Sequence, residues 1–450
     1  MFIIAIMNTR VKKGEFSMGK ITFLGAGSTV FAKNVLGDSM TVPALQDFEF
    51  ALFDIDHERL KDSEVILNNI KKNLNSSVRI VTYTNRKEAL RDAKYVINAI
   101  QVGGYEPSTV IDFEVPKKYG LRQTIADTLG IGGIFRNLRT IPVMMDFAKD
   151  MEEVCPDAWF LNYTNPMAVL TGTMLRYTDI KTVGLCHSVQ VCTDDLLKSL
   201  DMPTDKVQSK IAGINHMAWL LEVTRNGKDL YPEIKRRARE KQKTKHDDMV
   251  RFELMERFGY YVTESSEHNA EYHPYFIKDK YPELIDRFNI PLDEYPRRCV
   301  NQIEDWKQMR DDLVNDKDLT HTRTHEYGSY IMEAMETNNP IKIGGNVLNT
   351  GGLISNLPTN AVVEVPCLVD SSGVAPTYIG DLPEQLAALN RTNINTQLLT
   401  IEAAMTQKKD YIYQAAMLDP HTASELSIDD IVSLCDDLIE AHGDWLPEFK

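Results

Sequence analysis

Residues 20–29, which read KITFLGAGST, decide the fold of the first part of the chain. The apolar run KITFL predicts a short buried strand, and Gly25 and Gly27 predict a tight turn into a helix. A second apolar run, FEFALFDID at residues 48–56, precedes a helical pattern over residues 57–74. Apolar strands that alternate with helices are typical of a parallel sheet covered on both faces.

The alternation continues almost to residue 194, through the strand-like runs VRIVTYT, YVINAIQV, AWFLNYTNP and KTVGLCHS. Beyond it, longer charged helical stretches appear, together with a few strand-like segments such as AVVEVPCLVD. We therefore predict an α/β fold: a Rossmann-type doubly wound domain over residues 18–194, followed by a mixed α+β domain over residues 195–450. We expect residues 1–17 to form a flexible extension.

Composition narrows the class of partner. The 450 residues are 43% hydrophobic and 26% charged, a globular balance that fits one large domain or two ordinary ones. A net charge of −15 disfavours nucleic acid and anionic membrane surfaces, so we expect a small-molecule partner. The six cysteines form no CxxC pair, and the first apolar run is too short to cross a bilayer. These features indicate a cytoplasmic protein.

The glycine turn points to a dinucleotide. Gly25 permits the turn, Gly27 allows close approach of a pyrophosphate, and Ser28 and Thr29 open a helix whose free N–H groups attract negative charge. The third glycine of GxGxxG is absent, because Val30 occupies that position. The second strand ends in Asp54, placed to accept hydrogen bonds from ribose hydroxyls. This pair of features favours NAD over NADP.

Polar residues follow three later strands. Asn165 lies after one, Cys186 and His187 after the next, and His216 beyond the expected domain boundary. Cys186 and His216 are soft and borderline ligands that suit a transition metal. A buried structural cysteine and an ordinary histidine explain the same two residues, and taken alone the pair favours that simpler interpretation.

Other segments are less specific. Residues 262–272 are dense in titratable groups, which suits a loop that lines a polar site but also a surface connection. Asp127, Arg136 and Arg139 lie on a glycine-rich turn that enters a helix, a place suited to contact an oxygenated ligand. The two arginines are equally expected to pair with neighbouring acids. The basic run at residues 235–245 is interpreted as a solvated helix face. Four histidines lack metal-ligand spacing and are expected at the surface or in the core: His321, His325, His421 and His442.

The motifs in order resemble those of glycoside hydrolase family 4, from about residue 20 to the C-terminus. They are GAGST, DID, GGYEP, ADTLGIGG, NYTNPMA, GLCHSVQ, GINHMAW, TESSEHNAEYHPYF and HGDWLP. The sequence CHSV is similar to that of the α-galactosidase branch of the family. The resemblance implies a lactate/malate dehydrogenase-like fold, NAD as a cofactor, and manganese (Mn²⁺) bound by Cys186 and His216. It therefore reverses the simpler interpretation of those two residues.

The resemblance also implies a mechanism, which lies outside the usual paired-carboxylate chemistry of glycosidases. NAD⁺ takes a hydride from C3 of a terminal galactoside such as melibiose or raffinose, a base removes the C2 proton, and the leaving group is eliminated before water adds and the hydride returns. By matching positions, Asn165 contacts the sugar, His187 is the acid and Tyr272 is the base. Glu267 and His268 remain alternative bases.

Two rival functions share the nucleotide fold. A dehydrogenase of a small hydroxy acid consumes NAD and gives no reason for a ligand cysteine at Cys186. A non-catalytic NAD sensor binds nucleotide and tolerates loss of that thiol. For the hydrolase we also expect a homo-dimer or homo-tetramer, with no membrane or nucleic-acid partner.

Overall fold

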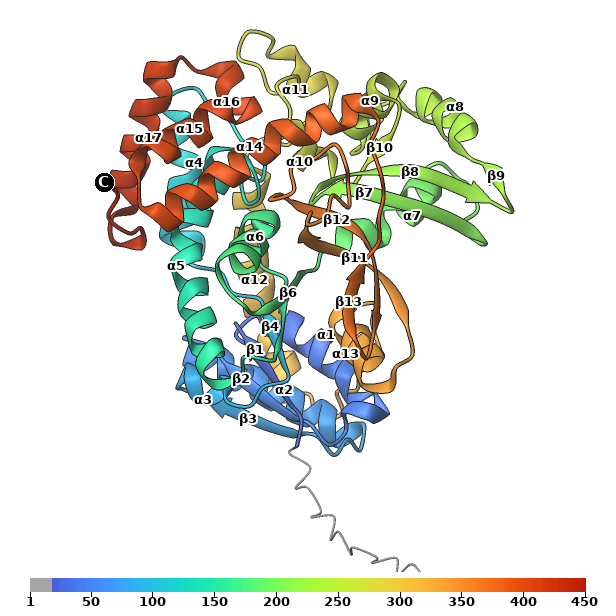
Figure 1. Cartoon of the computed structure of the whole chain (residues 1–450), viewed down its shortest axis with the longest axis vertical. Helices are drawn as coiled ribbons and strands as arrows, with labels where there is room; N and C mark the ends of the chain where they lie inside the picture. Colours follow the sequence, from blue (N-terminus) through green and yellow to red (C-terminus); the bar gives the residue numbers. More distant parts are fainter. Residues whose placement is uncertain (1–17) are drawn as a thin grey trace, which may run out of the picture.

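The computed structural model describes residues 18–450, so the predicted extension at residues 1–17 lies outside the described residues (Figure 1). Six parallel strands form its first half, in the spatial order β3-β2-β1-β4-β5-β6. This order is that of a Rossmann fold, which confirms the prediction. Their bounds are β1 (Lys20–Leu24), β2 (Glu49–Phe53), β3 (Arg79–Tyr83), β4 (Tyr95–Asn98), β5 (Trp159–Asn162) and β6 (Lys181–Gly184).

Helices cover both faces of this sheet, because its strands are buried apolar runs that need partners on each side. The helices of this half are α1 (Thr29–Met40), α2 (His57–Asn73), α3 (Arg86–Leu90), α4 (Val110–Lys117), α5 (Gly130–Val154), α6 (Met167–Tyr177) and α7 (His187–Ser199). Two short helical turns, η1 (Pro43–Leu45) and η2 (Gly104–Thr109), lie between them.

The second half is mixed α+β, as predicted, and its antiparallel strands extend the same sheet in the order β10-β8-β7-β12-β11-β6. Their bounds are β7 (Val207–Ile214), β8 (Met217–Arg225), β9 (Lys228–Asp229), β10 (Tyr261–Val262), β11 (Ile341–Leu348), β12 (Val362–Asp370) and β13 (Gly373–Pro376). Because α7 spans residue 194 and the sheet continues past it, the division there stays a prediction.

Long helices from the C-terminus pack back onto α4, α5 and α6 of the first half (Figure 1). The helices of the second half are α8 (Tyr231–Lys241), α9 (Met249–Phe258), α10 (Ser266–Glu271), α11 (Glu283–Arg287), α12 (Glu294–Asn315), α13 (Tyr327–Thr337), α14 (Glu384–Thr406), α15 (Lys409–Leu418), α16 (Pro420–Glu425) and α17 (Ile428–His442), followed by η3 (Gly443–Trp445). Among residues 18–450, no helix has the length and apolar character needed to cross a membrane.

Candidate active site

The glycine turn after β1 and the carboxylate after β2 form one unit. Gly25 has a φ of +87°, and a Cβ there would lie 2.6 Å from the carbonyl oxygen of Ala99. The amide of Gly27 donates to Oδ2 of Asp54 at 2.6 Å, and a Cβ on Gly27 would lie 2.8 Å from the same oxygen. Position 25 therefore requires glycine, whereas a side chain at position 27 would displace the Asp54 carboxylate. The turn and Asp54 lie at the same edge of the sheet, where β1 and β2 end.

Helix α1 starts directly after this turn and has no acidic residue in its first turn, so its N-terminus suits an anion. Ser28 immediately precedes the helix. The Thr29 side chain is buried and its hydroxyl contacts the Gly27 carbonyl and Ser63, so only its backbone faces a ligand. Val30 is 43% exposed, so the missing third glycine does not obstruct packing of α1 against the sheet.

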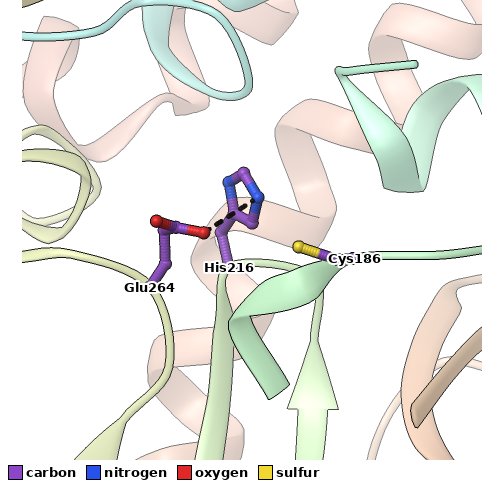
Figure 2. Close-up of side chains that lie close together, drawn as sticks. All are labelled: Cys186, His216 and Glu264. Carbon is purple, nitrogen blue, oxygen red and sulfur yellow. Dashed lines mark ion pairs between the residues drawn. The ribbon is translucent and has the colours of Figure 1, made fainter. Parts of the chain in front are cut away.

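Three segments bring a thiol, an imidazole and a carboxylate together. Cys186 follows β6, His216 lies in the turn between β7 and β8, and Glu264 follows β10. Their ligand atoms all lie within 4.8 Å of one another, and Nε2 of His216 is 3.3 Å from Oε2 of Glu264 (Figure 2). This donor set has the softness and spacing that a divalent transition metal requires.

The electrostatics of the cluster favour a cation. Burial alone would lower the pKa of His216, but the neighbouring Cys186 and Glu264 raise this pKa to about 10. Burial would likewise raise the pKa of Glu264, yet His216 and His268 hold that pKa below its usual value. The Glu264 carboxylate, beside the sulfur of Cys186, therefore attracts positive charge to this position, which suits a divalent ion.

A second layer orients His216 from its other ring nitrogen. Thr128 donates its hydroxyl proton to Oδ1 of Asp127 at 2.8 Å, so its oxygen is free to accept from Nδ1 of His216, 3.2 Å away. His268 and Arg136 hold the pKa of Asp127 well below its ordinary range, although burial opposes this. The arrangement favours an imidazole protonated on Nδ1, with Nε2 directed at the cluster.

Tyr272 lies beside the same nitrogen, with its hydroxyl 3.1 Å from Nδ1 of His216. Its side chain is completely buried, and this burial raises the pKa of the phenol well above 10. The structure thus brings Tyr272 to the cluster, in contact with a metal-type ligand.

His187 opens α7 next to Cys186, and its ring is half exposed. Its Nε2 lies 2.7 Å from Oε2 of Glu326, and this contact raises the pKa of His187. The ring of Tyr163 lies 6.1 Å from that of His187 and 4.8 Å from that of Phe31 on α1. A row of rings therefore runs from α1, the helix after the glycine turn, to His187, which is next to Cys186 in the chain.

Asn165 follows β5 at the same edge of the sheet. Its Oδ1 is buried and has no hydrogen-bond partner among residues 18–450. The loop that carries it is held by Thr164, which donates to the carbonyl oxygen of Ile100 after β4 at 3.2 Å. An unpaired polar atom on an anchored loop is available to a ligand hydroxyl.

The alternative bases are placed differently. Glu267 pairs with Arg298 at 2.7 Å, whereas His268 lies in the site, with Nδ1 2.8 Å from Oγ of Ser265 and Nε2 3.6 Å from Asp127. His268 is therefore the alternative base that lies within the site, whereas Glu267 is held in an ion pair with Arg298.

Both arginines near the glycine-rich turn pair within the protein. Arg139 is buried and donates both terminal nitrogens to Asp112, to which His442 also bonds at 2.9 Å. Arg136 donates to the Tyr295 hydroxyl at 3.1 Å. Pairing with a neighbouring acid therefore holds for Arg139, whereas Arg136 bonds a tyrosine hydroxyl.

The basic run at residues 235–245 is a solvated face of α8 and of the residues that follow it, as expected. Its side chains form ion pairs with nearby acids: Arg236–Glu233, Arg237–Glu233, Arg239–Glu256, Lys243–Glu240 and Lys245–Asp286.

Two site residues escaped sequence reasoning. Glu264 lies in the titratable segment at residues 262–272, so its neighbourhood was identified but its place in the cluster was not. Glu326 reaches His187 from 139 residues along the chain, and no local pattern marks it. Only the fold brings either residue to the site.

The chain matches known proteins along most of its length. Residues 20–202 match the model of family 4 glycosyl hydrolases, and residues 211–422 match that of the family 4 glycosyl hydrolase C-terminal domain. An alpha-galactosidase of Bacillus subtilis is 72% identical, over 96% of this chain and 100% of the relative. An alpha-galactosidase of Rhizobium meliloti is 33% identical, over 96% of this chain and 89% of the relative.

Solved structures have the same fold. A putative glucosidase from Bacillus subtilis superimposes with a TM-score of 0.83 at 25% identity, covering 94% of this chain and 99% of the other. A 6-phospho-alpha-glucosidase from gut microorganisms, in complex with NAD and Mn²⁺, gives 0.77 at 20% identity, covering 96% and 100%. Malate dehydrogenase from Cryptosporidium parvum gives 0.52 at 14% identity, covering 87% and 100%, which confirms the dehydrogenase-like fold. With both halves matched by its models, the chain belongs to glycosyl hydrolase family 4.

Proposed function

We propose that this chain hydrolyses terminal α-galactosides of the melibiose and raffinose type, with NAD and manganese as cofactors. The observation that carries the proposal is the cluster of Cys186, His216 and Glu264 at the sheet edge that also carries the glycine turn. The 72% identity to the Bacillus alpha-galactosidase supports the substrate class, and the NAD and Mn²⁺ bound by the 6-phospho-alpha-glucosidase support the cofactors.

The residues present fit both cofactors. When bound, NAD supplies a hydride acceptor and donor for C3 of the sugar, and manganese supplies a Lewis acid for the sugar oxygens. The turn at Gly25 and Gly27 would hold the pyrophosphate against α1, and Asp54 would accept from the ribose. Cys186, His216 and Glu264 would hold the metal.

His187 is the proposed acid for the leaving oxygen. Its hydrogen bond to Glu326 raises its pKa, so the imidazole keeps a proton near neutrality. Its half-exposed ring can reach a leaving group at the mouth of the site. Asn165, with its unpaired oxygen, is the proposed contact to the sugar hydroxyls.

Tyr272 is the proposed base for the C2 proton. The phenol must ionise although its burial opposes this, and a cation held by the neighbouring ligands favours the phenolate. In D₂O, Tyr272→Phe is expected to abolish deuterium uptake at C2 while Mn²⁺ affinity stays within about threefold of wild type. A variant that still exchanges C2, or that only loses the metal, would identify Tyr272 as a positioning residue and leave His268 as the base.

The two rivals are disfavoured by the same geometry. A dehydrogenase of a hydroxy acid needs arginines free for a carboxylate, yet Arg139 is paired with Asp112 and Arg136 bonds the Tyr295 hydroxyl. A NAD sensor gives no reason for the cluster of Cys186, His216 and Glu264 at the sheet edge that carries the glycine turn.

A chromogenic assay tests the proposal. p-Nitrophenyl α-galactoside is incubated with NAD⁺ and Mn²⁺, with each alone, and with neither, and the β-anomer serves as control. Colour from the α-anomer only when both are present, without net NADH, is expected. Colour without NAD⁺, or one NADH per turnover, would refute the hydrolase mechanism.

The cellular setting is part of the proposal. All six cysteines are free, which supports a reducing compartment and hence a cytoplasmic enzyme. Helix α12 exposes Val300 and Ile303 and buries only Cys299, which supports assembly into a homo-dimer or homo-tetramer. Light scattering on the purified chain tests the assembly.

A further inference from the structure

Four residues form a single row across four adjacent strands, β6, β11, β12 and β7. Gly184 on β6 is in register with Asn346 on β11, Asn346 with Glu364 on β12, and Glu364 with Gly213 on β7. The row contains the last residue of β6 and the residue before the last of β7. Cys186 follows Gly184 by two positions, and His216 follows Gly213 by three.

The outer strands of this row never pair with each other. Strand β6 meets β11 in register only at Gly184 and Asn346, and β7 meets β12 only at Gly213 and Glu364. Three strand spacings, about 14 Å, therefore separate the strands from which two of the metal-type ligands emerge. Yet the ligand atoms converge to within 4.8 Å, so the spacing of these strands decides the geometry of the cluster.

Side chains reinforce the row where the backbone ladder is thin. Nδ2 of Asn346 donates to Oε1 of Glu364 at 2.9 Å and also contacts the carbonyl oxygen of Gly184 at 3.4 Å. Only glycine fits at position 184, because a Cβ there would lie 2.9 Å from that of Asn346. The Asn346 amide thus connects β6, which leads to Cys186, with β12. Strand β12 in turn pairs with β7, which leads to His216.

Stability alone does not account for this pair. Both side chains are almost completely buried, and Oδ1 of Asn346 and Oε2 of Glu364 have no hydrogen-bond partner among residues 18–450. Burial also raises the pKa of Glu364 to about 7. A buried pair that leaves two polar atoms unsatisfied is less stabilising than a packed apolar pair, so its presence calls for a role other than stability.

We propose that Asn346 and Glu364 are positioning residues of the metal site, which hold the strands of Cys186 and His216 at the separation that lets both ligands reach one ion. The inference rests on the metal site of the proposed function. It assigns a role to two side chains on the antiparallel extension of the sheet, in neither of the segments that carry the ligands.

Mn²⁺ binding to the full chain in the absence of NAD tests this role without any turnover. Binding is measured as the loss of the EPR signal of the free ion. The near-isosteric Asn346→Leu removes the donor and is expected to weaken Mn²⁺ affinity by about tenfold or more. Glu364→Gln keeps an acceptor for Asn346 and is expected to stay within about threefold of wild type, whereas Glu364→Leu should match Asn346→Leu.

Cys367→Ala is the matched control. Cys367 is buried on β12, the strand of Glu364, and its register partner is Ile343, outside the row. This substitution should lower the melting temperature without changing Mn²⁺ affinity. If Asn346→Leu does not fold, Asn346→Ser, whose short hydroxyl cannot bridge both partners, should show the same loss.

A folded variant at Asn346 with wild-type Mn²⁺ affinity would overturn the inference. So would a wild-type chain that binds no Mn²⁺. A wild-type chain that binds Mn²⁺ but cleaves no α-galactoside would overturn the proposed substrate and leave this inference intact.

Discussion

The nucleotide turn and the metal-type cluster lie at the same edge of one sheet but are built in opposite ways. The turn is local: Gly25, Gly27 and Asp54 directly follow the adjacent parallel strands β1 and β2, and Gly27 bonds Asp54 directly. The cluster is assembled from distant segments, and an antiparallel extension of the sheet sets the distance between Cys186 and His216. A local site is robust to change elsewhere, whereas an assembled site depends on the fold around it.

The hardest test of the assembled site is Cys186→Ser. Loss of the thiolate ligand is expected to reduce α-galactosidase activity at least about 100-fold, beyond what a change behind the ligands costs. Mn²⁺ affinity should fall and NAD affinity should not. Cys192→Ala, which removes a buried thiol from α7, the helix that follows Cys186, is the control and should keep activity. Comparable activity in both variants would contradict the metal assignment.

Glu264→Gln tests the ligand that only the fold revealed. An amide is a weaker metal ligand than a carboxylate, so Mn²⁺ affinity and activity are expected to fall about 10- to 100-fold. Glu253→Gln, which removes an exposed pairing with Arg257 on α9, should change neither. If both variants bind Mn²⁺ equally, the cluster consists of Cys186 and His216 alone.

Gly27→Ala tests the local site. The added methyl group meets the Asp54 carboxylate, so NAD affinity, measured by calorimetry, is expected to fall about tenfold. Mn²⁺ affinity should be unchanged if the two sites are independent. Val30→Gly, which restores the third glycine of the motif at an exposed position, should leave NAD affinity within about twofold. A larger gain would show that Val30 limits the approach of the nucleotide.

These contrasts explain how far the sequence could predict the molecule. Short-range patterns were sufficient for the parallel half, because apolar strands and the glycine turn are local signals. Cys186 and His216 became convincing ligands only through resemblance to a family, since each alone fits a structural role. Glu264 and Glu326 could not be assigned, because their distances to the site depend on how β10 and the segment before α13 pack. Tyr272 and His268 both reach the cluster, so their roles need the experiments above.

The smallest expected effect is on the free energy of unfolding, and it tests folding independently of metal binding. His273 is buried, and this burial lowers its pKa to about 3. The unfolded chain takes up a proton near pH 6.5 that the folded chain does not, so stability is complete above that pH and falls as the pH drops toward 3. Between pH 6.5 and 5 the loss is about 2 kcal/mol. His273→Leu should flatten this part of the denaturation profile. An unchanged slope would show that His273 is accessible to protons in the folded state.

The continuous sheet has a mechanical consequence. Enzymes with two separate lobes often close on their ligand by bending a linker. Here one sheet runs from β3 to β10, but β6 and β11 are paired only at Gly184 and Asn346, so this junction between the two halves is narrow. Entry of a sugar then requires motion either of the loops at the edge of the sheet or of this narrow junction.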